Sequence, residues 1–147
     1  MDTQITTKFR IYSSAIEIFE AIVDPKRIGN FWFSSSSHRW EQGKQITLRY
    51  DEYGAVGIIN VLEVDLNKKI VFAWGAEYDN ETIVTITINE LEKMNTIVEI
   101  KESGFKAEDP DIVDKMIGQK EGWVYMLSCL KCYIENDVKN LRASLLH

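Results

Sequence analysis

The sequence predicts an α+β domain: a curved antiparallel sheet of about six strands that grips a long C-terminal helix, with two short helices after the first strand. Two observations favour this fold class. From Ser36 to Lys101, short apolar-polar segments alternate with polar turns, which is typical of an antiparallel meander. After them, apolar residues recur at helical spacing. Strands and helix in separate parts of the chain indicate a sheet with helix on one face.

The length of 147 residues indicates one domain, which we expect to span residues 1–147 and to bury about two thirds of the surface of the unfolded chain. The net charge is -6, and basic residues are scattered among acids, so no nucleic acid partner is expected. No segment approaches the ~20 apolar residues that span a bilayer, and the N-terminus does not resemble a signal peptide. We therefore expect a cytoplasmic protein with no membrane span. The oligomeric state stays open.

The first third of the chain contains one strand and two short helices. Residues 3–11 alternate between apolar and polar, as a half-buried strand does. Ser14 and Glu17 form a capping box that begins a helix, and this helix stops at Asp24-Pro25. Pro25 suits the first position of a second helix, which would carry Trp32.

The middle of the chain predicts the remaining strands. Alternating apolar residues, many of them β-branched, mark each strand, and polar residues mark each turn. The expected strands are 46–50, 56–65, 70–74, 84–88 and 96–101, and the expected turns are 51–54, 67–69, 77–81 and 92–95.

The C-terminal helix is predicted over residues 109–141, with its continuous part from Gln119 to Asn140. Asp109 before Pro110 supplies an N-cap and a preset first helical residue. Gly118 and Gly122 weaken the early turns. The apolar stripe should face the sheet, with Trp123 and Leu127 directed at Phe72 and Trp74; its members are Trp123, Leu127, Leu130, Ile134, Val138 and Leu141.

Candidates for catalysis or metal binding are few, so neither a metal nor a cofactor is expected. Cys129 and Cys132 have C-x-x-C spacing but lie in the middle of the helix, where structural thiols are the simpler interpretation. His38 is expected to be solvated, and His147 is the last residue. No triad or phosphate-binding glycine loop can be assembled.

Two glutamates leave alternatives open. Counted by twos, Glu102 shares a face with Thr96, Val98 and Ile100, so in a regular strand its carboxylate points inward and needs a partner. Alternatively, the strand ends at Lys101 and Glu102 points to solvent. Glu63 poses the same question in its own strand.

Aromatic and flexible apolar side chains come from the elements that would surround the space between helix and sheet. Such residues suit an adaptable apolar pocket, although they could equally fill the space as a solid core. With Glu102 as a polar group, the candidate ligand-binding residues are Trp32, Phe72, Trp74, Tyr78, Phe105, Met116, Trp123, Leu127 and Glu102.

The chain as a whole resembles the helix-grip (START and Bet v 1-like, SRPBCC) superfamily, in the branch similar to the C-terminal domain of the Hsp90 ATPase activator Aha1. The resemblance lies in segments 15–25, 57–74, 96–105 and 122–130, with Trp32 in the position of a family tryptophan. Gly43-Lys44 replaces a usual glycine pair, and the turn at Leu66-Asn67 lacks a frequent proline.

The resemblance implies a scaffold that carries several kinds of function. The first expectation is a non-enzymatic module that binds a small or medium apolar ligand between helix and sheet. The second is an Aha1-like partner of an Hsp90-type chaperone or of another protein. The third is an enzyme similar to polyketide cyclases, in which Glu102 or a tyrosine acts as acid or base.

Overall fold

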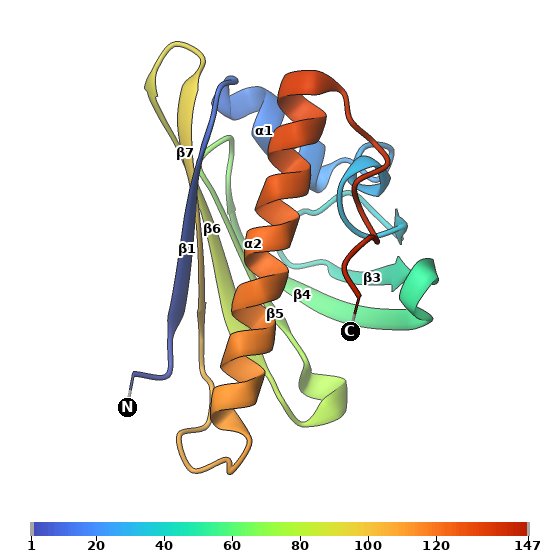
Figure 1. The fold of residues 1–147 in the computed structure, drawn as a ribbon, viewed down its shortest axis with the longest axis vertical. Coiled ribbons are helices and arrows are strands. Elements are labelled where there is room, and N and C mark those ends of the chain that lie inside the picture. The colour runs from blue at the N-terminus through green and yellow to red at the C-terminus, as the bar shows by residue number, and fades with distance from the viewer. Residues whose placement is uncertain (1, 147) are drawn as a thin grey trace.

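The computed structural model describes residues 2–146, and its elements follow the predicted order (Figure 1). The strands are β1 (Ile5–Ile11), β2 (Ser35–Ser36), β3 (Gln45–Tyr50), β4 (Ala55–Asp65), β5 (Lys69–Trp74), β6 (Thr82–Glu92) and β7 (Asn95–Ser103). The helices are α1 (Ala15–Val23) and α2 (Ile112–Asn136), with single 3-10 turns η1 (Ile28–Asn30), η2 (Asp51–Tyr53) and η3 (Ala76–Tyr78).

The strands form one antiparallel sheet in the order β1-β7-β6-β5-β4-β3-β2, so the predicted meander from β2 to β7 is confirmed, and β1 closes it beside β7. The seventh strand is the two-residue β2 at the far edge. Figure 1 shows α2 running along the concave face of the curved sheet, with the chain after α2 folded back toward β3 and β4. The predicted α+β fold class is therefore confirmed.

The capping box that begins α1 is half present. The Ser14 side chain accepts a hydrogen bond from the Glu17 backbone N–H at 3.2 Å, as a helix N-cap does. Ile18, Phe19 and Ile22 then turn one face of the helix into the core. The helix ends at Val23, before Asp24-Pro25, as predicted.

The second predicted helix is reduced to a 3-10 turn, and its residues explain why. Asp24 begins it by accepting from the Lys26 N–H at 2.9 Å, but only Ile28–Asn30 adopt helical conformation. Gly29 lies against the backbone, where an added Cβ would stand 3.0 Å from the Ser34 carbonyl oxygen. The chain therefore turns sharply here, and Trp32 follows the turn instead of lying in a helix.

The long helix is shorter at both ends than the sequence predicts. Asp109 accepts a hydrogen bond from the Asp111 N–H at 2.8 Å, and Asp111, not Asp109, occupies the N-cap position. At the other end Asp137 adopts left-handed φ, and its N–H bonds back to the Tyr133 carbonyl at 2.9 Å, which is the αL motif that ends helices. The prediction that helix continues to Leu141 is therefore wrong.

The inward direction of the helical stripe is confirmed. Trp123 and Leu127 are buried, and the Trp123 ring stacks on Trp74 at 5.2 Å between centroids. Phe72 lies beneath Trp74 in the fully buried core. No helix among residues 2–146 combines the length and the apolarity needed to cross a membrane.

Candidate ligand-binding site

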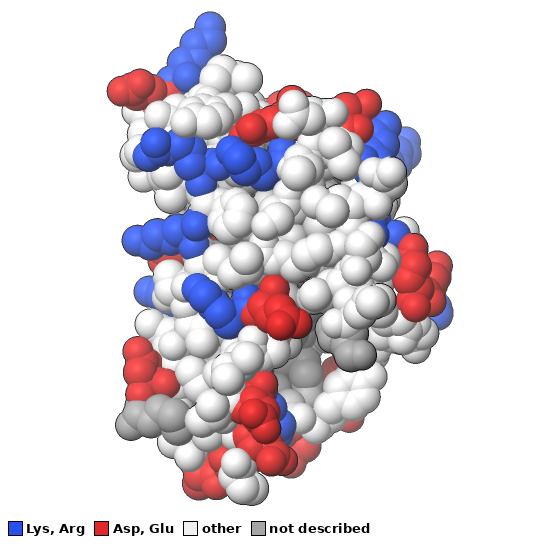
Figure 2. All heavy atoms as spheres, in the orientation of Figure 1, with Lys and Arg blue, Asp and Glu red and all other residues white. Residues whose placement is uncertain are grey.

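A cavity of about 650 Å³ lies between the N-terminal half of α2 and the strands β3 to β7. Its size falls within the range of small-molecule sites, so the space between helix and sheet is not solidly filled. Figure 2 shows a hollow in the surface between the lower half of α2 and the turn η3, which connects β5 to β6. The lining is mostly apolar: Phe33, Leu48, Ala55, Val56, Gly57, Ile58, Ile59, Trp74, Gly75, Glu77, Tyr78, Asn80, Thr82, Glu102, Asp114, Lys115, Gly118 and Gln119.

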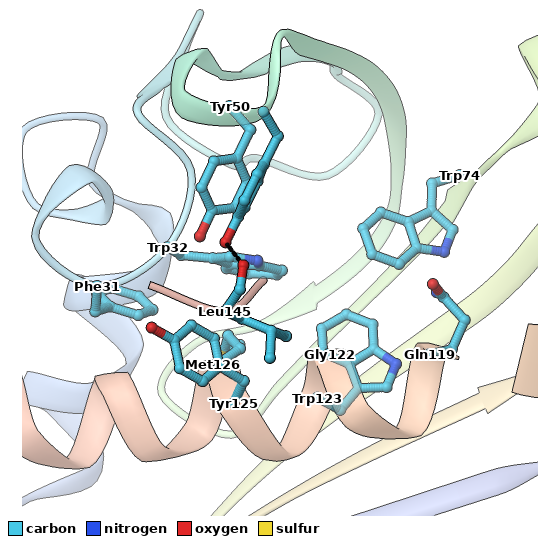
Figure 3. Close-up of a pocket in the computed structure, with 11 residues that line it drawn as sticks. Phe31, Trp32, Tyr50, Trp74, Gln119, Gly122, Trp123, Tyr125, Met126 and Leu145 are labelled. Carbon is cyan, nitrogen blue, oxygen red and sulfur yellow. Dashed lines mark hydrogen bonds between the residues drawn. The ribbon is translucent and has the colours of Figure 1, made fainter. Parts of the chain in front are cut away.

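A second cavity, of about 210 Å³, adjoins the first because Trp74 and Gln119 line both. Figure 3 shows how aromatic rings surround it, with Trp123 and Tyr125 from α2 facing Trp32 and Tyr50. Burial raises the pKa of the Tyr50 phenol to about 12, so this hydroxyl stays protonated at neutral pH. The smaller cavity thus has an aromatic wall with few polar atoms.

Glu102 is the buried polar centre between helix and sheet. Its strand continues to Ser103, so Glu102 stays on the inward face and only 1% of its surface is exposed. Of the two alternatives, the inward position is therefore the correct one, and the exit to solvent is wrong.

Neutral donors surround both oxygens of this carboxylate. Oε1 accepts from Trp123 Nε1 at 2.8 Å and from Gln119 Nε2 at 3.1 Å. Oε2 accepts from the Thr82 hydroxyl at 2.6 Å and from Trp74 Nε1 at 3.1 Å. A buried carboxylate needs such partners, and here they come from β5, β6 and α2. Glu102 therefore ties the helix to the sheet and fixes Trp74, which lines both cavities, and Trp123, which lines the smaller one.

The structure brings together five of the nine predicted site residues at the cavities. Trp74, Tyr78 and Glu102 line the larger cavity, while Trp32, Trp74 and Trp123 line the smaller one. Tyr78 lies at the mouth with 66% of its surface exposed, and its hydroxyl donates to the Val56 carbonyl at 3.2 Å.

The other four predicted residues lie outside both linings. Phe72 and Leu127 are fully buried in the core beneath them. Met116 is half-buried on α2, and Phe105 lines a separate void of about 40 Å³ beside Ile112. These four residues support the site from behind or beside it.

Sequence reasoning missed Gln119 and Thr82. Gln119 stands one helical turn before Trp123, so the stripe spacing could have placed it on the inward face. Thr82 faces Trp74 across the β5–β6 pair, a relation that depends on a register the sequence does not display.

The chain after α2 folds over the smaller cavity, and this segment, residues 137–146, is named the C-terminal strap. The Tyr125 hydroxyl donates to the Leu141 carbonyl and accepts from the Ser144 N–H. The Tyr53 hydroxyl donates to the Leu145 carbonyl at 2.8 Å, drawn as the dashed line in Figure 3, and Leu145 lines the cavity.

Arg142 anchors the C-terminal strap. Its guanidinium donates to both oxygens of Glu52, at 2.6 and 3.0 Å, and to the Trp32 carbonyl at 2.7 Å. It also lies 5.0 Å from the centroid of the Tyr50 ring. This bidentate ion pair lowers the pKa of the Glu52 carboxyl to about 2.

We expect the C-terminal strap to loosen in acid. Because the folded pKa of Glu52 is depressed, its contribution is present above about pH 4.5 and is lost as the pH falls toward 2. The heteronuclear NOE of the Ser144 and Leu145 amides should fall in this range. In the Glu52→Gln variant the same amides should already be mobile at pH 6, and matching pH profiles for the two proteins would contradict the assignment to Glu52.

The remaining sequence candidates have structural positions. Glu63 points outward and pairs with Lys69 at 2.7 Å, because a bulge at Leu62 breaks the alternation of β4. His38 is exposed, as expected. Cys129 is buried and Cys132 half-buried, and burial raises the pKa of the Cys129 thiol, so the interpretation as structural thiols holds. Over residues 2–146, no His, Cys, Asp or Glu side chains cluster as metal ligands.

Comparison with known proteins agrees with this geometry. The family model described as Activator of Hsp90 ATPase homolog 1-like protein matches residues 13–135. The comparison with curated proteins found no match. Among solved structures, protein SSP2350 from Staphylococcus saprophyticus is 49% identical, covers 92% of this chain and 94% of its own, and has a TM-score of 0.80.

Two more distant structures share the fold. The Aha1 dimer from Colwellia psychrerythraea is 18% identical, with 95% of this chain and 98% of that chain covered and a TM-score of 0.75. DynU16, a putative protein in the dynemicin biosynthetic locus, is 19% identical, with 95% of this chain but 49% of that chain covered and a TM-score of 0.80. On the family model and the SSP2350 match, the chain belongs to the family of Activator of Hsp90 ATPase homolog 1-like proteins, which have the helix-grip fold.

Proposed function

We propose that the protein is a non-enzymatic binding module that holds a small or medium apolar molecule in the larger cavity. The observation that carries this proposal is a cavity of about 650 Å³ between α2 and the sheet, lined mainly by apolar side chains around one buried carboxylate. Apolar walls with a few convergent polar groups are the usual form of a ligand site.

Burial of the ligand supplies the affinity in this proposal. Removing about 300 Å² of apolar ligand surface from water is worth roughly 7.5 kcal/mol at 25 cal/mol per Å². Loss of translational and rotational freedom offsets part of this gain. We therefore expect a dissociation constant between about 1 µM and 1 mM for a simple apolar molecule.

Titration with N-phenyl-1-naphthylamine, a neutral probe that fluoresces in apolar surroundings, tests the proposal. One saturable site per chain is expected, and dodecanol should displace the probe from it. Absence of saturable fluorescence at probe concentrations up to its solubility would contradict the proposed function.

A second candidate is contact with a chaperone of the Hsp90 class, which the family match and one surface feature favour. The outward face of α2 carries Val113, Ile117 and Val124, with 54%, 60% and 40% of their surfaces exposed. An exposed apolar stripe of this kind can bind a partner. Addition of this protein should then change the ATPase rate of the Hsp90 from the same organism, and an unchanged rate together with no binding would exclude this candidate.

A cyclase-like activity has less support from the same residues. Both oxygens of Glu102 already accept hydrogen bonds, from Trp74, Thr82, Gln119 and Trp123, and this favours an anchoring role over proton transfer. Tyr50, whose pKa is about 12, is poorly suited as a general base at neutral pH.

A further inference from the structure

The charged groups that line the larger cavity are mostly acidic. They are Glu77, Glu102 and Asp114, with Lys115 as the basic member. The Lys115 amine pairs with an acid outside the lining, since it lies 2.5 Å from the Asp109 carboxylate, and it also donates to the amide oxygen of the lining residue Asn80 at 3.1 Å. The hydrogen bond from Lys115 lowers the pKa of the Asp109 carboxyl below its usual value, so the negative charge of Asp109 offsets the positive charge of Lys115. The three carboxylates of the lining therefore give the cavity a negative potential.

Glu102, the innermost of these carboxylates, has no cationic partner in the described part of the chain. Among residues 2–146, no Lys, Arg or His nitrogen lies within 4.0 Å of Glu102, and its donors are the neutral groups of Trp74, Thr82, Gln119 and Trp123. Neutral donors stabilise a charge without cancelling it. Because the walls beside it are mostly apolar, the field of this carboxylate is screened less than at an open surface and acts on a charge that enters the cavity.

One of the donors to Glu102 can give way to a ligand. Gln119 Nε2 is shared between the two carboxylate oxygens at 3.1 and 3.2 Å, and its half-buried side chain lines both cavities. The indoles and the threonine that complete the set are fixed by stacking or by burial. A ligand N–H could therefore replace the amide of Gln119 at Glu102.

Aromatic rings line the same cavity. Phe33, Trp74 and Tyr78 border it, from the segment before β2, from β5 and from η3. The faces of such rings attract cations and repel anions. The aromatic rings therefore favour a cation in the cavity, as the carboxylates do.

We propose that the larger cavity selects amphiphiles whose apolar body ends in a cationic amine, and that it discriminates against those that end in a carboxylate. This inference rests on the proposed function and adds the chemical class of the ligand. The ammonium group would lie toward Glu102, while the hydrocarbon part would contact Leu48, Ile59 and the other apolar walls.

Three probes with the same chain test the selectivity: dodecylamine and dodecanoate, each used below its critical micelle concentration, and dodecanol, used below its solubility limit. Each displaces N-phenyl-1-naphthylamine at pH 7, and the competition gives its dissociation constant. We expect dodecylamine to bind at least about tenfold more tightly than dodecanoate, with dodecanol between them. Higher salt should reduce this ratio.

Substitutions at the mouth distinguish charge from shape. The double variant Glu77→Gln, Asp114→Asn keeps the size of both side chains, and an amide oxygen at position 77 can still accept from the Ile58 N–H, as Glu77 does at 3.2 Å. The amine-to-carboxylate ratio should fall at least about threefold in this variant, with dodecanol affinity unchanged. Glu121→Gln, on an exposed part of α2 outside the lining, is the matched control and should keep the full ratio.

The outcomes separate the two proposals. If dodecanoate binds as tightly as dodecylamine, the amine class is wrong while the ligand cavity stands. If the double variant keeps the full ratio, the part of the proposal that assigns the selectivity to Glu77 and Asp114 is wrong. If none of the three probes nor N-phenyl-1-naphthylamine binds, the proposed function itself is wrong and this inference is overturned with it.

Discussion

Replacing Glu102 by methionine should lower the free energy of unfolding by about 3 kcal/mol, measured by urea denaturation. Methionine has a similar volume but no strong acceptor. The variant therefore leaves the indole N–H of Trp123 and the buried Thr82 hydroxyl without their acceptor, whereas the indole N–H of Trp74 keeps the Thr82 hydroxyl oxygen at 3.0 Å. Each buried donor left without an acceptor costs about 1–3 kcal/mol, so the two together account for the expected loss.

Glu99→Gln is the matched control for this experiment. Glu99 lies on the same strand but on the outward face, where it pairs with Lys8 at 3.5 Å. Surface pairs of this kind contribute about 0–1 kcal/mol, so the control should differ little from the natural protein. A Glu102→Met variant as stable as the control would show that the carboxylate does not hold the helix to the sheet.

Placing a tryptophan at Gly118 should weaken the binding of N-phenyl-1-naphthylamine and of dodecanol at least about tenfold. Gly118 lies in the second turn of α2 and lines the larger cavity, and a Cβ added there would have no neighbouring atom within 4 Å. An indole can therefore enter the cavity without displacing the backbone. Competition between the side chain and the ligand for one space is the reason for the loss.

The alanine variant separates blockage from a change in the helix. Gly118→Ala adds one methyl group in open space, so binding should be nearly unchanged. Because glycine in a helix interior costs about 1 kcal/mol relative to alanine, this variant should be more stable than the natural protein by about that amount. Equal binding by the tryptophan variant and the alanine variant would place the ligand elsewhere.

The sequence was most informative where one periodicity extended over many residues. The alternation of Thr96, Val98 and Ile100 predicts the inward face of β7, while Glu102 has two alternatives that the continuation of the strand to Ser103 decides. The stripe of α2 likewise identified Trp123 and Leu127 as inward residues. In each case local pattern and tertiary burial agree, because a whole face must be covered.

The sequence was least informative where tertiary contacts override a local pattern. The bulge at Leu62 reverses the alternation of β4 and so decides the open question of Glu63, which points outward; single residues carry no signal for such a bulge. The apolar spacing extends the helical stripe to Leu141, but Asp137 ends the helix and the strap turns back because Arg142 binds Glu52 and the Trp32 carbonyl. These contacts join residues about 90 and 110 positions apart, which spacing along the chain cannot reveal.

The cavity itself could be anticipated only as one of two alternatives. The aromatic residues that surround it could have filled it, and the composition is the same in both cases. Several of the largest side chains pack on one another, with Trp74 stacked on Trp123 and Trp40 against Phe72, and this leaves the space beside Gly118 and Gly57 open. Side-chain direction, not residue type, decides between a core and a pocket.

The indole N–H resonances of the tryptophans offer the most direct test of the ligand cavity. In a titration with dodecylamine followed by 1H–15N NMR, the Trp74 resonance should shift with saturation at one ligand per chain, since Trp74 lines the cavity and donates to Glu102. The Trp40 indole, which lies outside both linings and is 3.3 Å from the Ser36 hydroxyl, should not shift. An unchanged Trp74 resonance at saturating ligand, with shifts only at exposed residues such as Val113 and Ile117, would contradict the account.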